Sequence, residues 1–309
     1  MPAVHTLRRL RVRARLRRAA VAHSLVAVAA TGCFAHRPID AEAPSWGAPA
    51  HGLLFGGDSL DDEGPGFVRA RPGEDTRWGT QRLVRALRRA AAEVAARHPG
   101  TAPLRIGDLS GPGGGRHPRH VSHRSGRDAD IVFYSTDAAG RSVRGRGWLA
   151  VDRFGVGHEG RAPQDATAGG PYFFDTPRNW TLVRTLALDP EARVQWIFCS
   201  RGVRARLLAW GARHETDPEA LRRLSRLLHQ PTRGRPHDDH FHVRLACSPR
   251  ERAAGCRDVG PLWPWLRRDR SPETEASTTR LDLEPALGDA VLLEALLGEP
   301  EATSEILRS

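Results

Sequence analysis

Two short segments, more than a hundred residues apart, combine histidine and aspartate so densely that they constrain this chain more than any other feature. The first is SHRSGRDADI at residues 122–131, and the second is HDDHFHVRL at residues 237–245. Together they supply imidazole nitrogens and carboxylate oxygens. If the fold brings them together, three side chains can hold a metal ion and further histidines remain as bases, which is how a catalytic zinc site is built.

The second segment predicts a strand that carries histidines on one face. Residues two apart on a strand project to the same side, so His240 and His242 point together while Phe241 and Val243 face an apolar layer. One of the two imidazoles can bind a metal ion, and the other can reach a water molecule beside it. His237 lies in the preceding loop and can approach from another side. The competing interpretation is a solvated, histidine-rich turn.

The first segment predicts a ligand pair in which a loop residue meets a strand residue. His123 lies on the loop, and Asp130 opens an apolar run, where a carboxylate needs a paired charge or a metal ion. Asp128 lies on the same strand face and competes for this role, or supports the loop through hydrogen bonds. Spacing alone also permits His117 or His120 in place of His123.

The remaining pattern predicts an α+β protein. Helices are predicted at 78–97, 179–188, 203–210 and 221–228, and strands at 104–109, 130–134, 194–198 and 241–245. Residues 52–66 and 135–170 have the composition of loops. Because helices and strands alternate without a regular βαβ rhythm, we expect a single domain in which helices and long loops flank a small antiparallel sheet that carries the metal site.

The N-terminal region predicts an export signal over residues 1–33. Seven arginines precede a short apolar stretch at 19–30, which is too short to span a bilayer. The following Ala30-Thr31-Gly32-Cys33 resembles a bacterial lipoprotein cleavage box, in which Cys33 is acylated and tethers the protein to a membrane. Plain cleavage near Ala30 is the alternative. Either way the sequence predicts a periplasmic or cell-envelope protein.

Composition predicts the boundaries of the folded domain and the chemical class of its binding partners. Residues 34–50 are rich in proline and alanine and are predicted to be a linker. The folded domain that carries the metal site is predicted to span residues 51–270. An acidic, mostly disordered tail is predicted at 271–309. All 47 basic residues are arginine, and the net charge is +11. Such a charge suits an anionic partner, for example an acidic cell-wall polymer. The arginines are dispersed and no motif combines them with aromatic residues, so we predict that nucleic acid is not bound.

Four cysteines fit an oxidising compartment. Cys247 and Cys256 lie nine residues apart in a loop after the second segment, and we predict that they form a disulfide that braces the end of the histidine strand. Cys199 lies in an apolar run and is predicted to be a buried thiol. If Cys33 is not acylated, a bond between Cys33 and Cys199 remains open.

The two segments also carry a family resemblance. The patterns Ser-His-x-x-Gly-x-Asp-x-Asp-Ile and His-x-x-His-Phe-His-Val-Arg-Leu-x-Cys resemble those of the penicillin-insensitive murein endopeptidases, which are zinc peptidases related to lysostaphin-like and D-Ala-D-Ala metallopeptidases. The similarity extends to residues 64–67, 106–110 and 247–249, and spans about residues 50–265. The acidic extension has no counterpart in the family, and the family's usual set of cysteines is incomplete.

This resemblance implies a role for each of six residues: zinc ligands His123, Asp130 and His242, general base His240, transition-state stabiliser His237, and site-lining His120. The implied activity is zinc-dependent cleavage of the cross-link between D-Ala and diaminopimelate in peptidoglycan. Two alternatives remain. One is a zinc D,D-carboxypeptidase or dipeptidase that trims stem peptides, and the other is a non-catalytic lipoprotein that binds peptidoglycan.

Overall fold

The two histidine-rich segments meet on neighbouring antiparallel strands in the middle of a seven-stranded sheet. The structure is a computed structural model that describes residues 44–145, 147–159, 171–232 and 234–267. The strands of this sheet, in spatial order, are β15 (Leu228–His229), β14 (Val194–Phe198), β16 (His240–Leu245), β8 (Asp128–Val132), β7 (Leu104–Ile106), β5 (Phe67–Arg69) and β4 (Glu63–Gly64). Neighbours are antiparallel except for the pairs β14–β15 and β5–β7, which are parallel.

Strand periodicity divides the two faces of this sheet as the sequence predicts. In β8 and β16, Ile131, Phe241 and Val243 belong to the hydrophobic core. Asp130 and His242 alternate with them and therefore project from the opposite face. One face thus supplies the apolar packing that holds the strands, and the other is free to carry polar chemistry.

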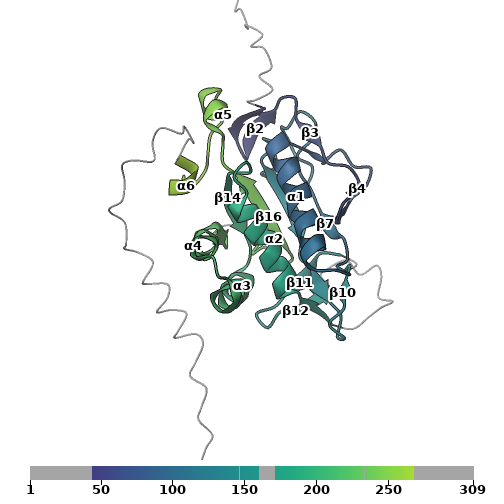
Figure 1. The fold of residues 1–309 in the computed structure, drawn as a ribbon. Helices are drawn as coiled ribbons and strands as arrows, with labels where there is room; N and C mark the ends of the chain where they lie inside the picture. Colours follow the sequence, from purple (N-terminus) through teal and green to yellow (C-terminus); the bar gives the residue numbers. More distant parts are fainter. Residues whose placement is uncertain (1–43, 146, 160–170, 233, 268–309) are drawn as a thin grey trace, which may run out of the picture. The chain divides into compact units, whose positions relative to one another are not determined.

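Helices cover the core face. They are α1 (Gln81–Arg97), α2 (Thr176–Leu188), α3 (Arg201–His214) and α4 (Pro218–Leu227). In α1, Leu83, Leu87 and Val94 lie on one apolar stripe and are completely buried, and Thr80 caps the first turn by accepting from the Leu83 amide. Figure 1 shows α1 and α2 running side by side in front of the sheet.

Smaller elements complete the domain. A five-stranded antiparallel sheet has the order β10 (Ser142–Val143), β9 (Ser135–Thr136), β13 (Tyr172–Phe174), β12 (Val156–Glu159) and β11 (Leu149–Val151). Two pairs stand apart: β1 (Ser45–Ala48) with β2 (His51–Leu54), and β3 (Asp58–Ser59) with β6 (Trp78–Gly79). Two short helices, α5 (Pro249–Ala253) and α6 (Pro264–Arg267), follow β16.

The predicted α+β class is confirmed, and the four long helices fall where the periodicity placed them. The differences lie in the segments predicted to be linker or loop. Residues 45–48 form β1, so the folded part begins before position 51, and the segments 52–66 and 135–170 contain β2 to β4 and β9 to β12. These strands have only two to four residues each, which is too short for an alternating pattern to be recognised.

Other predictions lie outside the described residues. They include the export signal at 1–33 with Cys33, and the acidic tail at 271–309. Within the described ranges, no helix is both long enough and apolar enough to span a bilayer.

The guanidinium of Arg127 joins the two ends of the described domain. Its side chain is completely buried. It donates hydrogen bonds to the Ser45 hydroxyl (2.9 Å) and to three backbone carbonyls, those of Leu245, Gly47 and Arg257, at 3.0 to 3.3 Å. Asp258 lies 3.3 Å away and balances the charge. A buried arginine is tolerated only with such complete pairing, so this network fixes β1 and the segment after α5 against the end of β16.

The predicted disulfide between Cys247 and Cys256 is confirmed. It closes the turn that contains α5, whose first residues are held by a capping box between Ser248 and Glu251. Cys199 is a buried free thiol, also as predicted. The disulfide lies directly beyond β16 and therefore braces the strand that carries His240 and His242.

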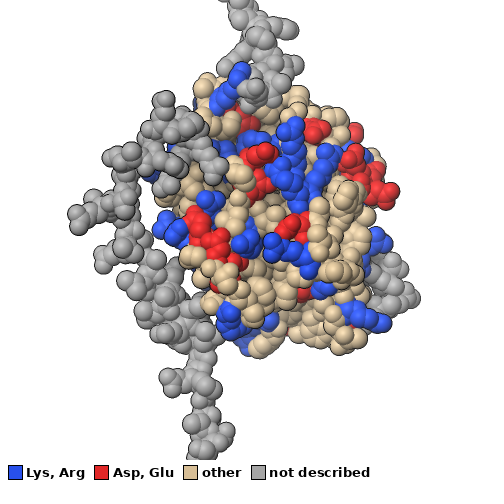
Figure 2. Space-filling view, in the orientation of Figure 1, with Lys and Arg blue, Asp and Glu red and all other residues tan. Residues whose placement is uncertain are grey.

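Charges on the helical face are paired. Figure 2 shows arginine and acidic side chains interspersed on the face that carries α1 and α2. Arg89 contacts both Asp189 (2.7 Å) and Glu191 (2.9 Å), and Arg82 contacts the buried Glu251 at 2.6 Å. This side of the basic protein therefore presents no broad field of one sign.

Replacing both Cys247 and Cys256 by serine is expected to lower the free energy of unfolding by roughly 2–3 kcal/mol, because a closed loop of this length restricts the unfolded chain. Urea unfolding followed by circular dichroism measures the change. Cys199→Ala serves as the control for loss of a thiol. An unchanged unfolding midpoint in the double variant would show that the disulfide does not brace the domain.

Candidate metal centre and catalytic histidines

Three side-chain atoms from the two segments converge at the centre of the open sheet face. His123 Nε2 and His242 Nδ1 each lie 3.2 Å from Asp130 Oδ1. The pairing of β8 with β16 places Asp130 directly opposite His242, and the loop before β8 brings His123 over both. Atoms that share one ion at about 2.1 Å in tetrahedral geometry lie about 3.4 Å apart. The observed separations therefore fit a metal site.

The polar atoms in this cluster lack the partners that buried groups normally have. His123 Nε2 and Asp130 Oδ1 are buried and accept or donate no hydrogen bond among the described residues. An unpartnered buried carboxylate oxygen beside an unpartnered imidazole nitrogen is unfavourable unless a cation lies between them. The residues present thus fit a metal ion on the chemistry of their donor atoms as well as on their spacing.

His123 is held in position by its backbone and by its second ring nitrogen. Its φ angle is +63°, one of three positive values among the described non-glycine residues. Nδ1 lies 3.1 Å from the Leu109 carbonyl and donates to it, and the Ser110 hydroxyl donates to the His123 carbonyl at 2.6 Å. With Nδ1 protonated, Nε2 presents its lone pair to Asp130. Positive φ costs energy, and such residues gather at functional sites.

Asp128 orients the other histidine ligand. Its Oδ1 lies 3.2 Å from His242 Nε2, which leaves Nδ1 of the same ring free to face Asp130. Arg244 donates to the same carboxylate at 2.6 Å. Burial by itself raises the pKa of Asp128, but the charge of Arg244 and the hydrogen bond from His242 outweigh it and hold the pKa well below its usual range. We therefore favour Asp128 as an ionised support for His242 rather than as a ligand.

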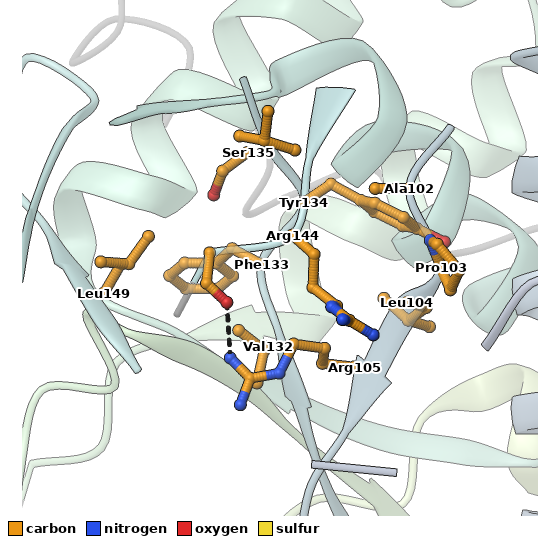
Figure 3. Close-up of a pocket in the computed structure, with 12 residues that line it drawn as sticks. Ala102, Pro103, Leu104, Arg105, Val132, Phe133, Tyr134, Ser135, Arg144 and Leu149 are labelled. Carbon is orange, nitrogen blue, oxygen red and sulfur yellow. Dashed lines mark hydrogen bonds between the residues drawn. The ribbon is translucent and has the colours of Figure 1, made fainter. Parts of the chain in front are cut away.

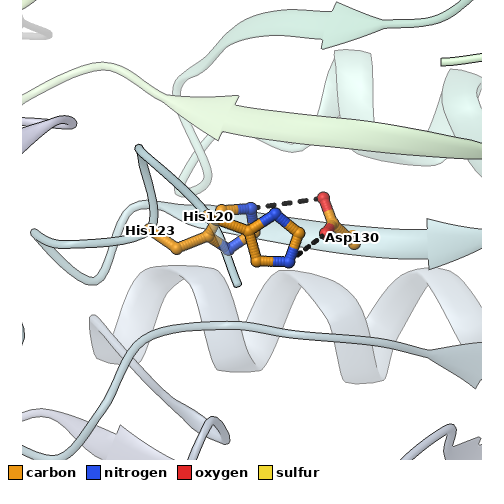
Figure 4. A group of neighbouring side chains, drawn as sticks. All are labelled: His120, His123 and Asp130. Atoms are coloured by element: carbon orange, nitrogen blue, oxygen red, sulfur yellow. Dashed lines mark ion pairs between the residues drawn. The ribbon is translucent and has the colours of Figure 1, made fainter. Parts of the chain in front are cut away.

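His120 lies beside the same centre but has another partner. Figure 4 shows the rings of His120 and His123 next to each other, each facing a different oxygen of the Asp130 carboxylate, and ligand atoms of all three residues fall within 4.8 Å of one another. His120 Nε2 lies 3.0 Å from Asp108 Oδ2 and 3.4 Å from Asp130 Oδ2. Because Asp108 already accepts from this nitrogen, we favour His242 as the third ligand and place His120 in the wall of the site.

His240 points its free nitrogen at the same centre. His240 Nε2 lies 3.5 Å from Asp130 Oδ1, and Nδ1 is hydrogen-bonded to Asp239 at 2.5 Å. Burial tends to lower the pKa of His240, but Asp130 and Asp239 outweigh it and raise that pKa. The ring is thus fixed by one carboxylate and is basic at the nitrogen that faces the cluster, as a general base requires.

His237 completes the group from the loop before β16. Its φ angle is +54°. Its ring centre lies 4.9 Å from that of His240 and 5.5 Å from that of His242. Nδ1 lies 3.0 Å from the Arg235 carbonyl. Burial and the two neighbouring histidines lower the pKa of His237 to about 4, so the ring is neutral at pH 7 in the absence of other ligands.

Four supporting residues were not predicted from the sequence: Asp108, Trp148, Asp239 and Arg244. Strand alternation provides a signal for Arg244, since it follows His240 and His242 at the same two-residue spacing. Asp239 is adjacent to His240, but neighbours on a chain need not interact, and no pattern marks the pair. Nothing in the sequence connects Trp148 with the site, although its ring stands edge-on to His240 with 5.0 Å between centres.

Comparison with known proteins agrees with this geometry. A family model described as penicillin-insensitive murein endopeptidase matches residues 45–264. The chain is 28% identical to a Haemophilus influenzae protein of that name over 274 residues, which cover 83% of this chain and 86% of that protein. A Klebsiella pneumoniae protein of the same name is 27% identical over 232 residues, or 74% of each chain.

The match extends across the whole described domain, including both histidine-rich segments. A Salmonella paratyphi C relative, also named penicillin-insensitive murein endopeptidase, is 33% identical over a shorter stretch of 97 residues, or 31% of this chain and 35% of that protein. Since the family model covers well over half of the sequence, the chain belongs to the penicillin-insensitive murein endopeptidase family.

Proposed function

We propose that this protein is a zinc-dependent endopeptidase that cleaves the D-Ala–diaminopimelate cross-link between peptidoglycan stem peptides. The observation that carries the proposal is the convergence of His123 Nε2, Asp130 Oδ1 and His242 Nδ1, with His240 directed at the same point. Family membership supports the substrate class.

The donor set supports zinc among the common divalent ions. Two imidazole nitrogens and one carboxylate oxygen suit zinc, and three protein ligands leave a coordination position open, as catalytic zinc sites do. A bound zinc ion supplies a Lewis acid for the scissile carbonyl and lowers the pKa of water toward neutrality. Leu109 and Asp128 hold the outer nitrogens of the two histidine ligands, and such partners set ligand orientation and affinity.

His240 acts as the general base. Asp239 holds Nδ1 of the ring, so the lone pair on Nε2 faces the reacting centre and can take a proton from the attacking water. The same nitrogen then returns the proton to the leaving amine as the peptide bond breaks. Because no serine or cysteine nucleophile takes part, reagents that acylate a serine do not block the reaction.

The resemblance implies that His237 stabilises the transition state, which a protonated ring could do, and its lowered pKa restricts that role. Its Nδ1 faces the Arg235 carbonyl, so a neutral ring presents only a lone pair at Nε2. His237 can stabilise a developing oxyanion only after it gains a proton during turnover. Its role as an oxyanion partner therefore remains a proposal that is secondary to that of His240.

The location follows from the substrate. A protein that acts on peptidoglycan works in the cell envelope, and we propose that residues 1–33 direct export. If Cys33 is acylated, the domain is tethered to a membrane through the segment that follows it.

Cross-linked muropeptide dimers test the activity directly. The protein without residues 1–33 is expected to convert the dimers to monomers, and His240→Ala is expected to reduce kcat by about 10² to 10⁴, because general acid–base catalysis contributes that much. Chromatography with mass spectrometry identifies the products. The matched control is His214→Ala, which removes an exposed histidine from α3 and should leave the rate unchanged.

The products also distinguish the alternatives. Loss of terminal D-Ala from intact dimers would support a carboxypeptidase instead. Tight binding to sacculi with zinc present and no cleavage would support a non-catalytic binding protein. Full activity of His240→Ala would exclude that residue as the base.

Metal removal is expected to abolish activity without unfolding the domain. The two histidine ligands are held by protein hydrogen bonds, so their geometry does not depend on the ion. Dialysis against a chelator, followed by activity and circular dichroism measurements, tests this expectation, and added zinc should restore cleavage. Loss of the folded spectrum on chelation would contradict it.

Asp128→Asn is expected to weaken zinc binding by about 10- to 100-fold, as loss of a carboxylate behind a histidine ligand typically does. Competition with a fluorescent chelator measures the affinity. Asp61→Asn is the matched control, because Asp61 is exposed and its ion-pair partner among the described residues is Arg88 on α1. Unchanged zinc affinity in Asp128→Asn would remove Asp128 from the metal site.

A further inference from the structure

A small pocket opens on the sheet beside the metal centre. It lies between β7, the segment after β8, and the chain around β10 and β11, and Figure 3 shows Arg105 and Arg144 among the side chains that line it. Val132, Phe133 and Leu149 form its apolar part. Two arginines in a largely apolar hollow distinguish it from an ordinary packing defect.

The pocket is within reach of a peptide held at the metal centre. Val132 lines the pocket and follows Asp130 by two residues on the same face of β8, which corresponds to about 6.6 Å. Val132 is also the strand partner of His240. A substrate with its scissile bond at His240 would therefore extend one or two residues before it reaches this pocket.

Trp148 packs beside the metal centre and directly precedes Leu149 of the pocket lining. Its indole lies on Gly107, where an added Cβ would be 2.5 Å from the Trp148 ring and 3.3 Å from the Asp130 side chain. The same indole stands edge-on to His240. The absence of a side chain at Gly107 thus lets one aromatic ring pack between the metal centre and the strand that carries Arg105.

Arg105 has no counter-charge among the described residues. Its Nη1 donates to the carbonyls of Gly145 and Gly147, at 2.9 Å each, which fixes the guanidinium beside the loop. No carboxylate of the described chain forms an ion pair with Arg105 or Arg144. Burial lowers the pKa of Arg105, and the charges of Arg144 and Arg71 lower it further. Two neighbouring cations without an acid favour an anionic ligand.

We propose that this pocket binds a free carboxylate of the stem peptide next to the scissile bond, with Arg105 and Arg144 as its two cationic contacts. The assignment rests on the proposed peptidase function, and it adds a recognition site to it. Arg105 is held by the carbonyls of Gly145 and Gly147 through one nitrogen, so its remaining donors are available to a carboxylate. Arg144 is exposed and can close over the ligand from the solvent side.

Tyr134 adds an independent sign of a ligand. Its side chain is only 4% exposed, and its hydroxyl is buried with no hydrogen-bond partner among the described residues. A buried phenol normally finds a partner. Tyr134 lines the same pocket, and Figure 3 shows its hydroxyl on the side of Pro103, where an ordered water molecule or a further part of the ligand can satisfy it.

The test compares substrates that differ only in charge. Three cross-linked dimers are used: one with free carboxylates, one amidated at diaminopimelate, and one amidated at the terminal D-Ala. With the free dimer, Arg144→Ala and Arg105→Lys are expected to raise KM about tenfold with little change in kcat, because a charge-assisted contact to a carboxylate is lost. With the dimer that lacks the recognised carboxylate, the same variants should differ from the unmodified protein by less than about twofold.

Arg213→Ala is the matched control, because it removes an exposed arginine from α3 and should leave KM unchanged for every dimer. Thermal unfolding identifies any variant that is merely destabilised; Arg144→Ala removes an exposed side chain and is the decisive one. An equal rise in KM with all three dimers, or no rise with any, would overturn the assignment.

Binding separates this inference from the proposed activity. Calorimetry with the three dimers is carried out on His240→Ala, with and without Arg144→Ala. Weaker binding of the free dimer in the double variant supports the pocket even if the unmodified protein cleaves nothing, in which case the endopeptidase proposal alone fails. Cleavage by the unmodified protein together with unchanged binding in the double variant would contradict the pocket alone.

Discussion

The antiparallel pairing of β8 with β16 is the constraint on which the site depends. It sets Asp130 opposite His242 and Asp128 opposite Arg244, so two of the proposed metal ligands and the ion pair that supports them arise from one register. A slip of one residue would turn every one of these side chains into the hydrophobic core. Ile131, Phe241 and Val243 prevent that slip, because their burial specifies which face is apolar. The hydrophobic packing on one side of the sheet thus aligns the polar chemistry on the other.

Three histidines of the site are each held by a hydrogen bond to the ring nitrogen that points away from its centre. Leu109, Asp128 and Asp239 bind the outer nitrogens of His123, His242 and His240 in turn. A ring held in this way has one tautomer and one direction, and it loses little freedom when a ligand arrives. The backbones of His123 and His237 are also fixed, because a positive φ is unfavourable for a non-glycine residue and persists only where the surrounding structure enforces it. The folding free energy of the rest of the domain offsets this local cost.

Sequence reasoning located the histidine strand, the four long helices and the disulfide, because each has a local signature. Alternation indicated that His240 and His242 share a face, and the structure agrees. It could not choose His123 over His117 or His120 by spacing; the family resemblance made that choice, and the contact between His120 and Asp108 now supports it on physical grounds. Trp148 and Arg105 were missed because their roles come from contacts across separate strands and loops, and Asp239 was missed because no sequence pattern marks its contact with the adjacent His240. The shortest strands were missed for another reason. Two or three residues are too few to show an alternation of apolar and polar side chains.

Arg127 needs hydrogen-bond acceptors from both ends of the folded domain. Two of its hydrogen-bond acceptors, Ser45 and Gly47, precede position 51, and two more, the Arg257 carbonyl and the Asp258 carboxylate, follow the disulfide. Proteolytic trimming past either end would leave a completely buried cation short of acceptors, directly next to Asp128 in the chain. Damage at the termini would then reach Asp128, the support of His242, through a single peptide bond. Cleavage at the proposed position 33 would stay clear of this network, whereas cleavage a dozen residues further on would not.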